Sequence, residues 1–229
     1  MSDARMIETL RAGALIAAPP GRAGVAWHPA AKRAMDVALA GLLLALLALP
    51  MLLLALLVRA DGGPALFAHT RVGKAGQRFG CLKFRSMVLD AECRLNVLLE
   101  ADPAARQEWA TSRKLKNDPR VTRIGKFLRA TSLDELPQLI NVLRGEMSLV
   151  GPRPVTEAEL AANYGAAAEH YQLVRPGITG PWQVSGRSET SYDRRVALDV
   201  AYATQPSLLT DLRLLLATPI AVLTRRGAY

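Results

Sequence analysis

The apolar run from Val37 to Val58, which contains no charged residue, is the feature that most constrains the fold. A helix of about 20 apolar residues is long enough to cross a bilayer. Pro50 lies just past the middle of the run, removes a backbone donor there, and so predicts a kink or a break. The run therefore either spans the bilayer, or enters it, bends at Pro50 and returns to the same face. A buried helix of a soluble protein is a weaker interpretation, because the run has no polar face to meet water.

Basic residues flank the run at both ends: Lys32 and Arg33 precede it, and Arg59 follows it. Since positive charge marks the cytoplasmic side, flanks of one sign give no clear asymmetry between inside and outside. We therefore predict a re-entrant membrane segment over residues 32–59, in the form helix–break–helix, with Pro50 at the bend and both ends cytoplasmic.

The rest of the chain is predicted to form one α+β domain over residues 60–229, mostly helical, preceded by a disordered tail over residues 1–31. Two short segments around Gly73-Lys74-Ala75-Gly76 predict a small β-hairpin, whose glycines match neither the Walker A nor the Rossmann pattern. Helices are predicted over residues 88–112, with an interruption at Asp102-Pro103, and over residues 157–173, 191–202 and 207–223. The last of these is amphipathic enough to lie in the membrane interface, or it packs in the core.

The formal charge of +9 limits the partners that the chain is suited to bind. It fits nucleic acid, an anionic membrane surface or a phosphorylated substrate. The two cysteines, Cys81 and Cys93, provide no disulfide framework and fit a reducing compartment. The three histidines are scattered without metal-ligand spacing, so a zinc site is not expected.

The stretch from Thr131 to Pro154 contains residues suited to phosphoryl chemistry. Asp134 and Glu135 are adjacent acids in apolar surroundings, and Gly151-Pro152-Arg153-Pro154 is a rigid turn that presents one guanidinium. Carboxylates can hold a divalent ion or attack phosphorus, and an arginine can hold phosphate oxygens. On composition alone a structural interpretation is favoured, because the S-x-x-E pattern that ends at Glu135 fits a capping box at a helix start.

Other polar residues could complete such a site. Lys83 and Arg85 alternate along one predicted strand and can point to the same side, although a solvated strand face explains them more simply. Arg129 comes just before the acid pair. The loop from Arg175 to Arg187 includes Gln183 and several glycines. It suits a nucleotide or another anion, or it only connects two elements.

Four blocks of the sequence, read in order, resemble the bacterial sugar transferase family, the monotopic polyprenyl-phosphate hexose-1-phosphate transferases. The blocks are KRAMD with the proline-broken apolar run, CLKFRSM, RATSLDELPQLINVLRGEMSLVGPRP and RPGITGPWQVSGR. The resemblance covers Lys32 to Tyr229. Within the family, DGGPALFAHTRVG and RRGAY are most similar to the galactose-1-phosphate transferases of succinoglycan-type exopolysaccharide synthesis. One departure is Leu49, which stands where the family commonly has a serine before the membrane proline.

The resemblance implies the reaction and the roles of the acids. A UDP-hexose, carrying galactose or glucose, would give its sugar-1-phosphate to undecaprenyl phosphate with release of UMP, through a covalent aspartyl-phosphosugar. This would be the first membrane step of exopolysaccharide synthesis. Asp134 matches the nucleophile, and Glu135 matches the ligand of a Mg²⁺ cofactor. Lys83, Arg129 and Arg153 match basic residues of the same site.

Further expectations complete this interpretation. Arg85 is grouped with the phosphate-binding residues, and Arg175, Gln183 and Arg187 are assigned to the nucleotide side. Residues 60–229 would be the catalytic domain at the cytoplasmic face of the bacterial inner membrane. Inner-membrane lipids would be partners, nucleic acid would not, and a homodimer is left open.

Two competing hypotheses are open to direct tests. A non-catalytic basic protein anchored at the membrane explains the charge and the apolar run but gives the acid pair no purpose. Release of UMP from a UDP-sugar would exclude it. An ordinary membrane-anchored glycosyltransferase would release UDP instead of UMP.

Overall fold

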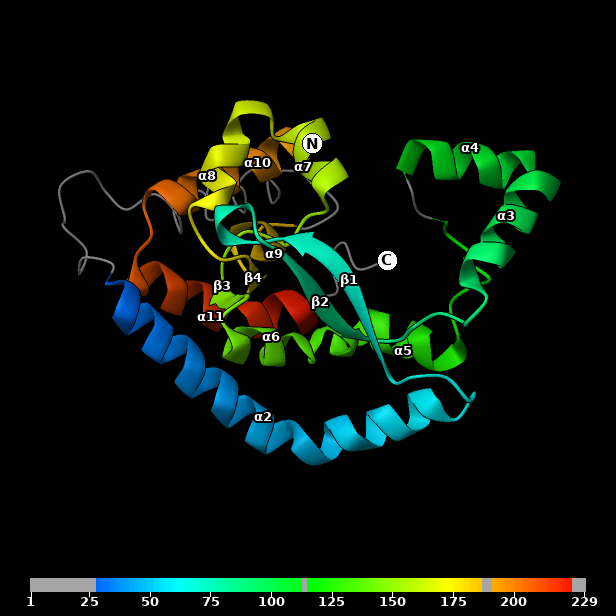
Figure 1. Ribbon diagram of the computed structural model, residues 1–229, viewed down its shortest axis with the longest axis horizontal. Coiled ribbons are helices and arrows are strands. Elements are labelled where there is room, and N and C mark those ends of the chain that lie inside the picture. The colour runs from blue at the N-terminus through cyan, green and yellow to red at the C-terminus, as the bar shows by residue number, and fades with distance from the viewer. Residues whose placement is uncertain (1–27, 113–114, 187–190, 224–229) are drawn as a thin grey trace.

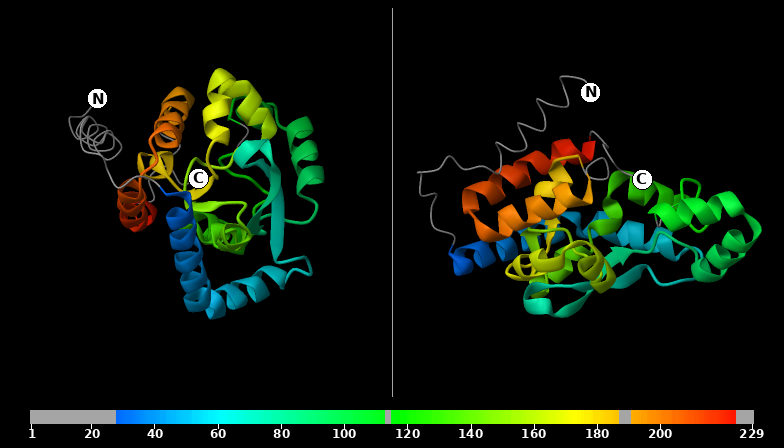
Figure 2. Two further views of the ribbon diagram at one scale, coloured as in Figure 1. Left: turned by 60° about the vertical axis from the view of Figure 1, so that its left-hand side comes forward. Right: turned by 90° about the horizontal axis from the view of Figure 1, so that it is seen from above.

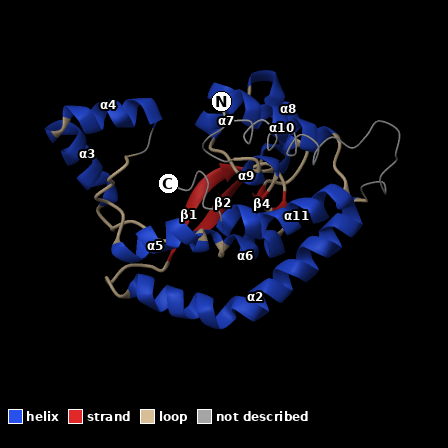
Figure 3. Ribbon diagram, turned by 180° about the vertical axis from the view of Figure 1, so that it is seen from behind, coloured by secondary structure: helices blue, strands red, loops and turns tan. Residues whose placement is uncertain are grey.

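The computed structural model describes residues 28–112, 115–186 and 191–223, so most of the predicted tail lies outside the described residues. The described part of the fold is mostly helical, as predicted, and contains two small sheets (Figures 1 and 3). The strands are β1 (Leu66–Val72), β2 (Arg78–Phe84), β3 (Ser148–Val150) and β4 (Gly177–Thr179). The α-helices are α2 (Pro29–Arg59), α3 (Ala91–Ala101), α4 (Pro103–Ser112), α5 (Arg123–Thr131), α6 (Gln138–Arg144), α7 (Glu157–Asn163), α8 (Ala168–Gln172), α9 (Pro181–Val184), α10 (Tyr192–Thr204) and α11 (Leu208–Leu223), with short 3-10 turns η1 (Lys74–Gly76), η2 (Leu133–Glu135) and η3 (Gly165–Ala167).

The elements pack around one main core, and one arm projects from it. Helix α2 runs along an edge of the molecule against α6, and α3 and α4 form the arm (Figure 1). The largest buried cluster takes Ala40 from α2, Phe79 and Cys81 from β2, Val142 from α6 and Leu214 from α11. Burial of these apolar side chains holds the first half of α2 against the rest of the molecule.

Helix α2 is continuous through Pro50, so the predicted break in the helix is wrong. The missing amide and the ring of the proline instead bend the helix sharply (Figure 2, left). Within the described residues, α2 is the one helix long and apolar enough to cross a membrane. Its middle exposes a set of leucines: Leu42, Leu46, Leu49, Leu52, Leu53, Leu56 and Leu57.

Both ends of α2 are attached to the same body. Near its start, Asp36 accepts a hydrogen bond from the backbone N–H of Leu149 in β3, at 3.1 Å. At its end, the carbonyl of Val58 accepts from Arg85 Nη2 at 2.8 Å, and Val58 packs with Phe84 and Leu128. The bent helix therefore leaves the body and returns to it.

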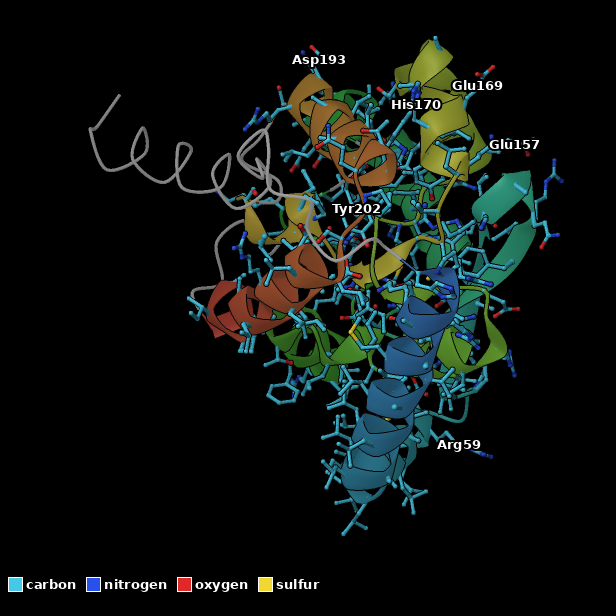
Figure 4. The ribbon with its side chains drawn as sticks, turned by 90° about the vertical axis from the view of Figure 1, so that its left-hand side faces the viewer. Arg59, Glu157, Glu169, His170, Asp193 and Tyr202 are labelled. Carbon is cyan, nitrogen blue, oxygen red and sulfur yellow. The ribbon has the colours of Figure 1, made fainter. Side chains whose placement is uncertain are left out.

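The start of α2 is held by a buried ionic network that we call the Lys32 cluster. Lys32 Nζ lies 3.0 Å from Asp36 Oδ1 and 3.1 Å from Asp211 Oδ2 of α11. Tyr202 of α10 (Figure 4) donates to Asp211 Oδ1 of α11 at 2.7 Å. Ser148 Oγ donates to Asp36 Oδ2 at 2.8 Å. Because these buried polar groups have partners, the cluster fixes α2 relative to β3, α10 and α11.

The predicted hairpin is confirmed. Strands β1 and β2 are antiparallel, with Phe67 opposite Lys83 and Arg71 opposite Phe79. Since directly opposed residues point to the same face, one face of the hairpin carries all four of these side chains. The connection over η1 includes Gly76 at a φ of 74°, a conformation that glycine adopts at little cost.

A second sheet, which the sequence analysis did not predict, pairs β3 and β4 in parallel. Strands of three residues are too short to give a periodic signal, and their pairing is long-range. The helix predicted over residues 157–173 is interrupted: α7 ends before Gly165, which has a φ of 48°. The interruption predicted at Asp102-Pro103 is confirmed, because α3 ends at Ala101 and α4 begins at Pro103.

Candidate active site

A small cavity lies where the hairpin, η2, the turn after β3 and the loop around β4 meet. The short parallel sheet brings the last two segments together: the N–H of Gly151 donates to Thr179 O at 3.0 Å, and the N–H of Gly177 donates to Pro152 O at 2.8 Å. The residues that line the cavity come from these four segments and from the starts of α6 and α9: Arg71, Cys81, Lys83, Glu135, Gln138, Arg153, Pro154, Gly177, Ile178 and Gln183.

The acid pair lies on η2, beneath strand β2. Lys83 Nζ lies 2.6 Å from Glu135 Oε1 and 3.7 Å from Asp134 Oδ2. Asn141 of α6 holds the strand in place, because its side chain accepts from the N–H of Leu82 at 2.9 Å and donates to Gly80 O at 2.8 Å. One lysine therefore bridges two adjacent carboxylates at the wall of the cavity.

The capping-box interpretation of the acid pair is wrong. Ser132 has a φ of 58° and ends α5, and its side chain makes no capping hydrogen bond to η2. Helix α6 begins only at Gln138, after Pro137, where a proline has no intrahelical bond to lose. The two acids are thus not needed to close a helix start, which removes the structural reason for placing them there.

The surroundings of Asp134 favour its neutral form more than water does. Asp134 is buried, and burial raises the pKa of its carboxyl. The charge of Lys83 opposes this shift, Glu135 adds to it, and Arg129 and Arg153 oppose it. A desolvated carboxylate next to several cations is poorly shielded by water and is suited to attack an electrophile.

Two arginines lie beside the acids. Arg153 Nη1 is 3.9 Å from Glu135 Oε1, and its guanidinium carbon lies 5.3 Å from the ring centre of Trp182. Arg129 donates from Nε to Ser86 Oγ at 2.9 Å, and it is close enough to Asp134 to interact with its charge. Together with Lys83, these side chains form a basic surface around the acid pair, which suits a diphosphate.

The turn that carries Arg153 requires glycine. A Cβ on Gly151 would collide with the carbonyl of Arg175, and one on Gly177 would collide with the amide of Gly151. The close approach of these two backbones fixes where the turn ends and therefore where Arg153 projects.

The structure corrects the grouping of Arg85 with the phosphate-binding residues. Its Nε donates to Pro64 O at 2.8 Å, and Nη1 donates to Asp61 Oδ2 at 2.7 Å and to Met87 O at 3.1 Å. Its Nη2 donates to Val58 O at 2.8 Å and to Asp61 Oδ1. All five N–H donors of the guanidinium are thus used at the end of α2, and none remains for a substrate.

The residues assigned to the nucleotide side are placed differently from one another. Gln183 is buried and lines the cavity. Arg175 donates from Nε to Gly145 O at 2.6 Å, which ties its loop to the end of α6. Arg187 lies outside the described residues. Of the two that the structure describes, Gln183 lines the same cavity as Glu135, and Arg175 does not.

Sequence reasoning missed Arg71, Gln138 and Trp182. Arg71 lies on the same face of the hairpin as Lys83, a relation that depends on the strand register. Gln138 follows the acid pair by one helical turn, and this spacing could have indicated it. Trp182 meets Arg153 only because β3 and β4 pair, so no local signal indicates it.

The donor set at the acid pair fits a magnesium ion. Within the described residues no group of three or more Asp, Glu, His or Cys side chains could hold a metal by itself. Mg²⁺ commonly keeps several waters and takes one or two carboxylates together with substrate phosphates, so an acid pair is sufficient. In the structure the cation nearest to Glu135 Oε1 is the ammonium of Lys83, at 2.6 Å.

Comparisons with known proteins show the family to which the chain belongs. The family model for bacterial sugar transferases matches residues 27–225. A UDP-galactose-lipid carrier transferase of Erwinia amylovora is 52% identical over 198 residues, which are 86% of this chain and 41% of that protein. An exopolysaccharide production protein of Sinorhizobium fredii is 51% identical over 199 residues, 86% of this chain and 88% of that protein.

A third relative is an undecaprenyl-phosphate galactose phosphotransferase of Salmonella typhimurium, 48% identical over 198 residues, 86% of this chain and 41% of that protein. The chain thus spans about two fifths of the length of two of these relatives and most of the other. The acids, the glycines of the tight turn and Arg153 all lie within the matched range. The chain belongs to the bacterial sugar transferase family.

Proposed function

We propose that the protein transfers hexose-1-phosphate from a UDP-hexose to undecaprenyl phosphate and releases UMP, as the first membrane step of exopolysaccharide synthesis. The observation that carries this proposal is the acid pair: Asp134 is buried, Glu135 lines the cavity, Lys83 bridges the two, and Arg153 lies beside Glu135. The names of the relatives, which include a UDP-galactose-lipid carrier transferase, support the substrate class.

The transfer takes place in two displacements. In the first, a carboxylate oxygen of Asp134 bonds to the sugar-proximal phosphorus, and the bond from that phosphorus to the UMP oxygen breaks. In the second, a phosphate oxygen of the lipid bonds to the same phosphorus, and the Asp134 carboxylate leaves. A covalent intermediate divides one difficult transfer into two steps and lets a soluble nucleotide and a lipid use one site in turn.

The charges around Asp134 make the first attack possible. A diphosphate would repel an attacking carboxylate unless cations screen it. Lys83, Arg129 and Arg153 supply fixed positive charge near the acids. Glu135 would hold Mg²⁺, which when bound neutralises diphosphate charge. The fixed cations need no rearrangement as charge moves to the leaving group, which is the basis of electrostatic catalysis.

The proposal places the cavity at the cytoplasmic face of the inner membrane. Helix α2 bends at Pro50, and both its ends attach to one body, which supports a helix that enters the bilayer and returns. Helix α11 adds exposed apolar side chains, Leu209, Leu212, Leu216 and Ile220. UDP-sugars are made in the cytoplasm, so a re-entrant helix keeps the site with its donor.

Cysteine labelling tests this topology. A Ser2→Cys variant that also carries Cys93→Ser would be treated with an impermeant maleimide in sealed cells. The exposed natural Cys93, on α3, is the matched reporter for the catalytic domain. We expect both positions to be protected until the membrane is opened. Labelling of position 2 from the periplasm alone would show a spanning helix.

The decisive test of the reaction is the intact-protein mass after mixing with a UDP-hexose and Mg²⁺ in the absence of lipid. We expect a hexose-phosphate adduct that maps to Asp134, with one UMP released per site. Asp134→Asn should give neither the adduct nor UMP. Full activity of that variant, or kinetics that require both substrates bound together, would contradict the covalent route.

The donor is proposed to be UDP-galactose first and UDP-glucose second. The support is the similarity along most of the chain to relatives whose names include galactose. A panel of UDP-sugars tests it by UMP release. Efficient turnover of UDP-N-acetylglucosamine, with none of the two hexoses, would show the donor assignment to be wrong, and release of UDP would indicate an ordinary glycosyltransferase.

A further inference from the structure

Arg71 lines the same cavity as the acid pair but at some distance from it. On the hairpin, Lys83 is opposite Phe67, and Arg71 lies four residues further along β1 on the same face. At about 3.3 Å per residue, the two Cα positions are separated by roughly 13 Å along the strand direction. Lys83 and Arg71 therefore mark two ends of the β-sheet wall of the cavity.

The guanidinium of Arg71 is held from one side. Its Nη1 donates to Glu159 Oε2 at 2.8 Å, and its Nη2 lies 3.2 Å from His69 Nδ1. Burial and the charge of Arg71 lower the pKa of His69, so the neutral ring can accept. Among the described residues these contacts use two of the five N–H donors of Arg71. The others can serve a ligand.

Glu159 is fixed as firmly as its partner. Its Oε2 accepts from the N–H of Thr156 at 2.8 Å and from Thr156 Oγ1 at 3.1 Å, in a capping box at the start of α7. Burial opposes ionisation of Glu159, but these hydrogen bonds and Arg71 outweigh it and lower the pKa of its carboxyl. A fixed arginine–carboxylate pair offers both donors and acceptors, as hydroxyl groups require.

We propose that Arg71, positioned by Glu159, binds hydroxyl groups of a sugar ring of the nucleotide-sugar donor. This inference rests on the proposed function. Asp134 must reach the diphosphate, so the diphosphate lies at the Lys83 end of the cavity. In a UDP-hexose the diphosphate joins two polyhydroxyl rings, the hexose on one side and the ribose on the other. Arg71, at the other end of the wall, would therefore contact one of these two rings, and the experiment distinguishes them.

The hairpin and α7 also carry a second arginine–glutamate pair, which serves as a matched control. Arg78 of β2 donates from Nη2 to Glu157 Oε2 at 2.6 Å. Glu157 lies at the start of α7 beside the hairpin (Figure 4). The side chains of this control pair are 66% and 67% exposed, whereas that of Arg71 is 18% exposed. Neither member of the control pair lines the cavity. Both pairs tie the hairpin to α7, but only Arg71 lines the cavity. Only the Arg71–Glu159 pair should therefore affect binding of the donor.

The test compares Arg71→Gln with Arg78→Gln in the full chain, purified in nanodiscs. With UDP-galactose as donor, we expect Arg71→Gln to raise KM by about tenfold, as for loss of a hydrogen bond to a charged group, with kcat changed little. Arg78→Gln should keep both within about twofold, as an exposed pair contributes little. If Arg71→Gln folds poorly, Glu159→Gln, which still accepts from Thr156, should raise KM against its control Glu157→Gln.

Two nucleotide probes identify the ring. Binding of UMP and of its 2′,3′-dideoxy analogue is followed by fluorescence of Trp182, whose ring lies against Arg153. Weaker binding of UMP, but not of the analogue, by Arg71→Gln indicates a ribose contact. Unchanged UMP binding with a raised KM for UDP-galactose indicates a hexose contact.

Two outcomes overturn the inference. If Arg71→Gln lowers thermal stability while KM and UMP binding match those of Arg78→Gln, the pair only ties the hairpin to α7. If the unsubstituted protein neither binds UMP nor consumes any UDP-hexose, the proposed function fails and this inference fails with it. The first outcome leaves the proposed function intact, so the two failures are distinguishable.

Discussion

The Lys32 cluster and the acid pair each have one lysine between two carboxylates, but the surroundings of the two sites differ. Lys32 lies 3.0 and 3.1 Å from its two carboxylates, and its side chain is 7% exposed. Lys83 lies 2.6 and 3.7 Å from its own, and its side chain is 27% exposed at a cavity wall. In both, burial raises the pKa of one carboxyl, that of Asp211 and that of Asp134. The same charge motif therefore occurs once inside the protein and once at its surface.

The difference lies in what else surrounds each motif. In the Lys32 cluster, neutral donors complete the carboxylates: Ser148 Oγ, the N–H of Leu149 and Tyr202 OH. At the acid pair, Arg153 adds a second cation beside Glu135, and Lys83, Glu135 and Arg153 all line the cavity. A closed network with neutral donors holds elements together, whereas an open one with surplus positive charge can accept an anionic substrate.

The largest effect is expected for Lys83→Met, which keeps the side-chain stem and removes the charge. Loss of one positioned charge near the reacting phosphate should lower kcat by about 10²- to 10³-fold. Thermal stability should change little, because a partly exposed ion pair contributes at most about 1 kcal/mol. UMP release measures the first quantity and a melting curve the second. Lys74→Met, at an exposed lysine on η1 of the same hairpin, is the control.

Equal activity of Lys83→Met and Lys74→Met would show that the acid pair with Lys83 is not the reactive site. A large loss of stability in Lys83→Met would instead show that Lys83 has a structural role, as Lys32 has in the Lys32 cluster.

Lys32→Met should have the opposite profile. It leaves two buried carboxylates without their cation, which typically costs about 3–5 kcal/mol of unfolding free energy. The double variant Lys32→Met/Asp211→Asn should recover part of this loss, because Asn can still accept from Tyr202 and no longer carries charge. Chemical denaturation in detergent measures both. A Lys32→Met protein as stable as the original would contradict the assignment of a structural role.

Arg85→Lys tests whether Arg85 binds substrate phosphate or only holds the end of α2. Lysine has three donors and cannot reproduce the five hydrogen bonds of the guanidinium or its two contacts with Asp61. We expect a loss of about 2 kcal/mol in unfolding free energy, with KM for the donor unchanged. Arg153→Lys should do the reverse, raising KM with little effect on stability. A raised KM in Arg85→Lys would return Arg85 to the phosphate-binding residues.

Local sequence signals predicted the parts of the fold that depend on neighbouring residues. The hairpin, the proline bend of α2 and the stop at Asp102-Pro103 follow from turn chemistry and strand or helix periods. The linear motifs also picked out Glu135 and Arg153, which line one cavity with Lys83, and Asp134, which lies 3.7 Å from Lys83. Continuity of α2 through Pro50 was missed, because a proline that bends a long helix and one that ends it give the same local signal.

The remainder depends on contacts between distant residues, which have no local signature. Lys32 and Asp36 stand four residues apart in the KRAMD block, but their partner Asp211 comes from the other end of the chain. Arg85 and Lys83 alternate on paper, yet β2 ends at Phe84, so Arg85 leaves the strand and turns to Asp61. Arg71 could be placed beside the cavity only once the hairpin register was known.

The smallest expected effect is a shift in the acidic limb of the pH–rate profile. Asp134 must be ionised to attack, so kcat/KM should fall about tenfold per pH unit below its pKa. Burial raises that pKa, so the fall should begin above the pH expected for an ordinary aspartate. Since the charge of Lys83 opposes the shift, the residual activity of Lys83→Met should lose its acid tolerance at a still higher pH. Asp211 is also buried with a raised pKa, yet Asp211→Asn should leave the limb where it is, because this carboxyl does not meet the substrate. The pH–rate profiles of the unsubstituted protein, Lys83→Met and Asp211→Asn are recorded at saturating Mg²⁺. An acidic limb that shifts in Asp211→Asn and not in Lys83→Met would assign the essential ionisation to the Lys32 cluster.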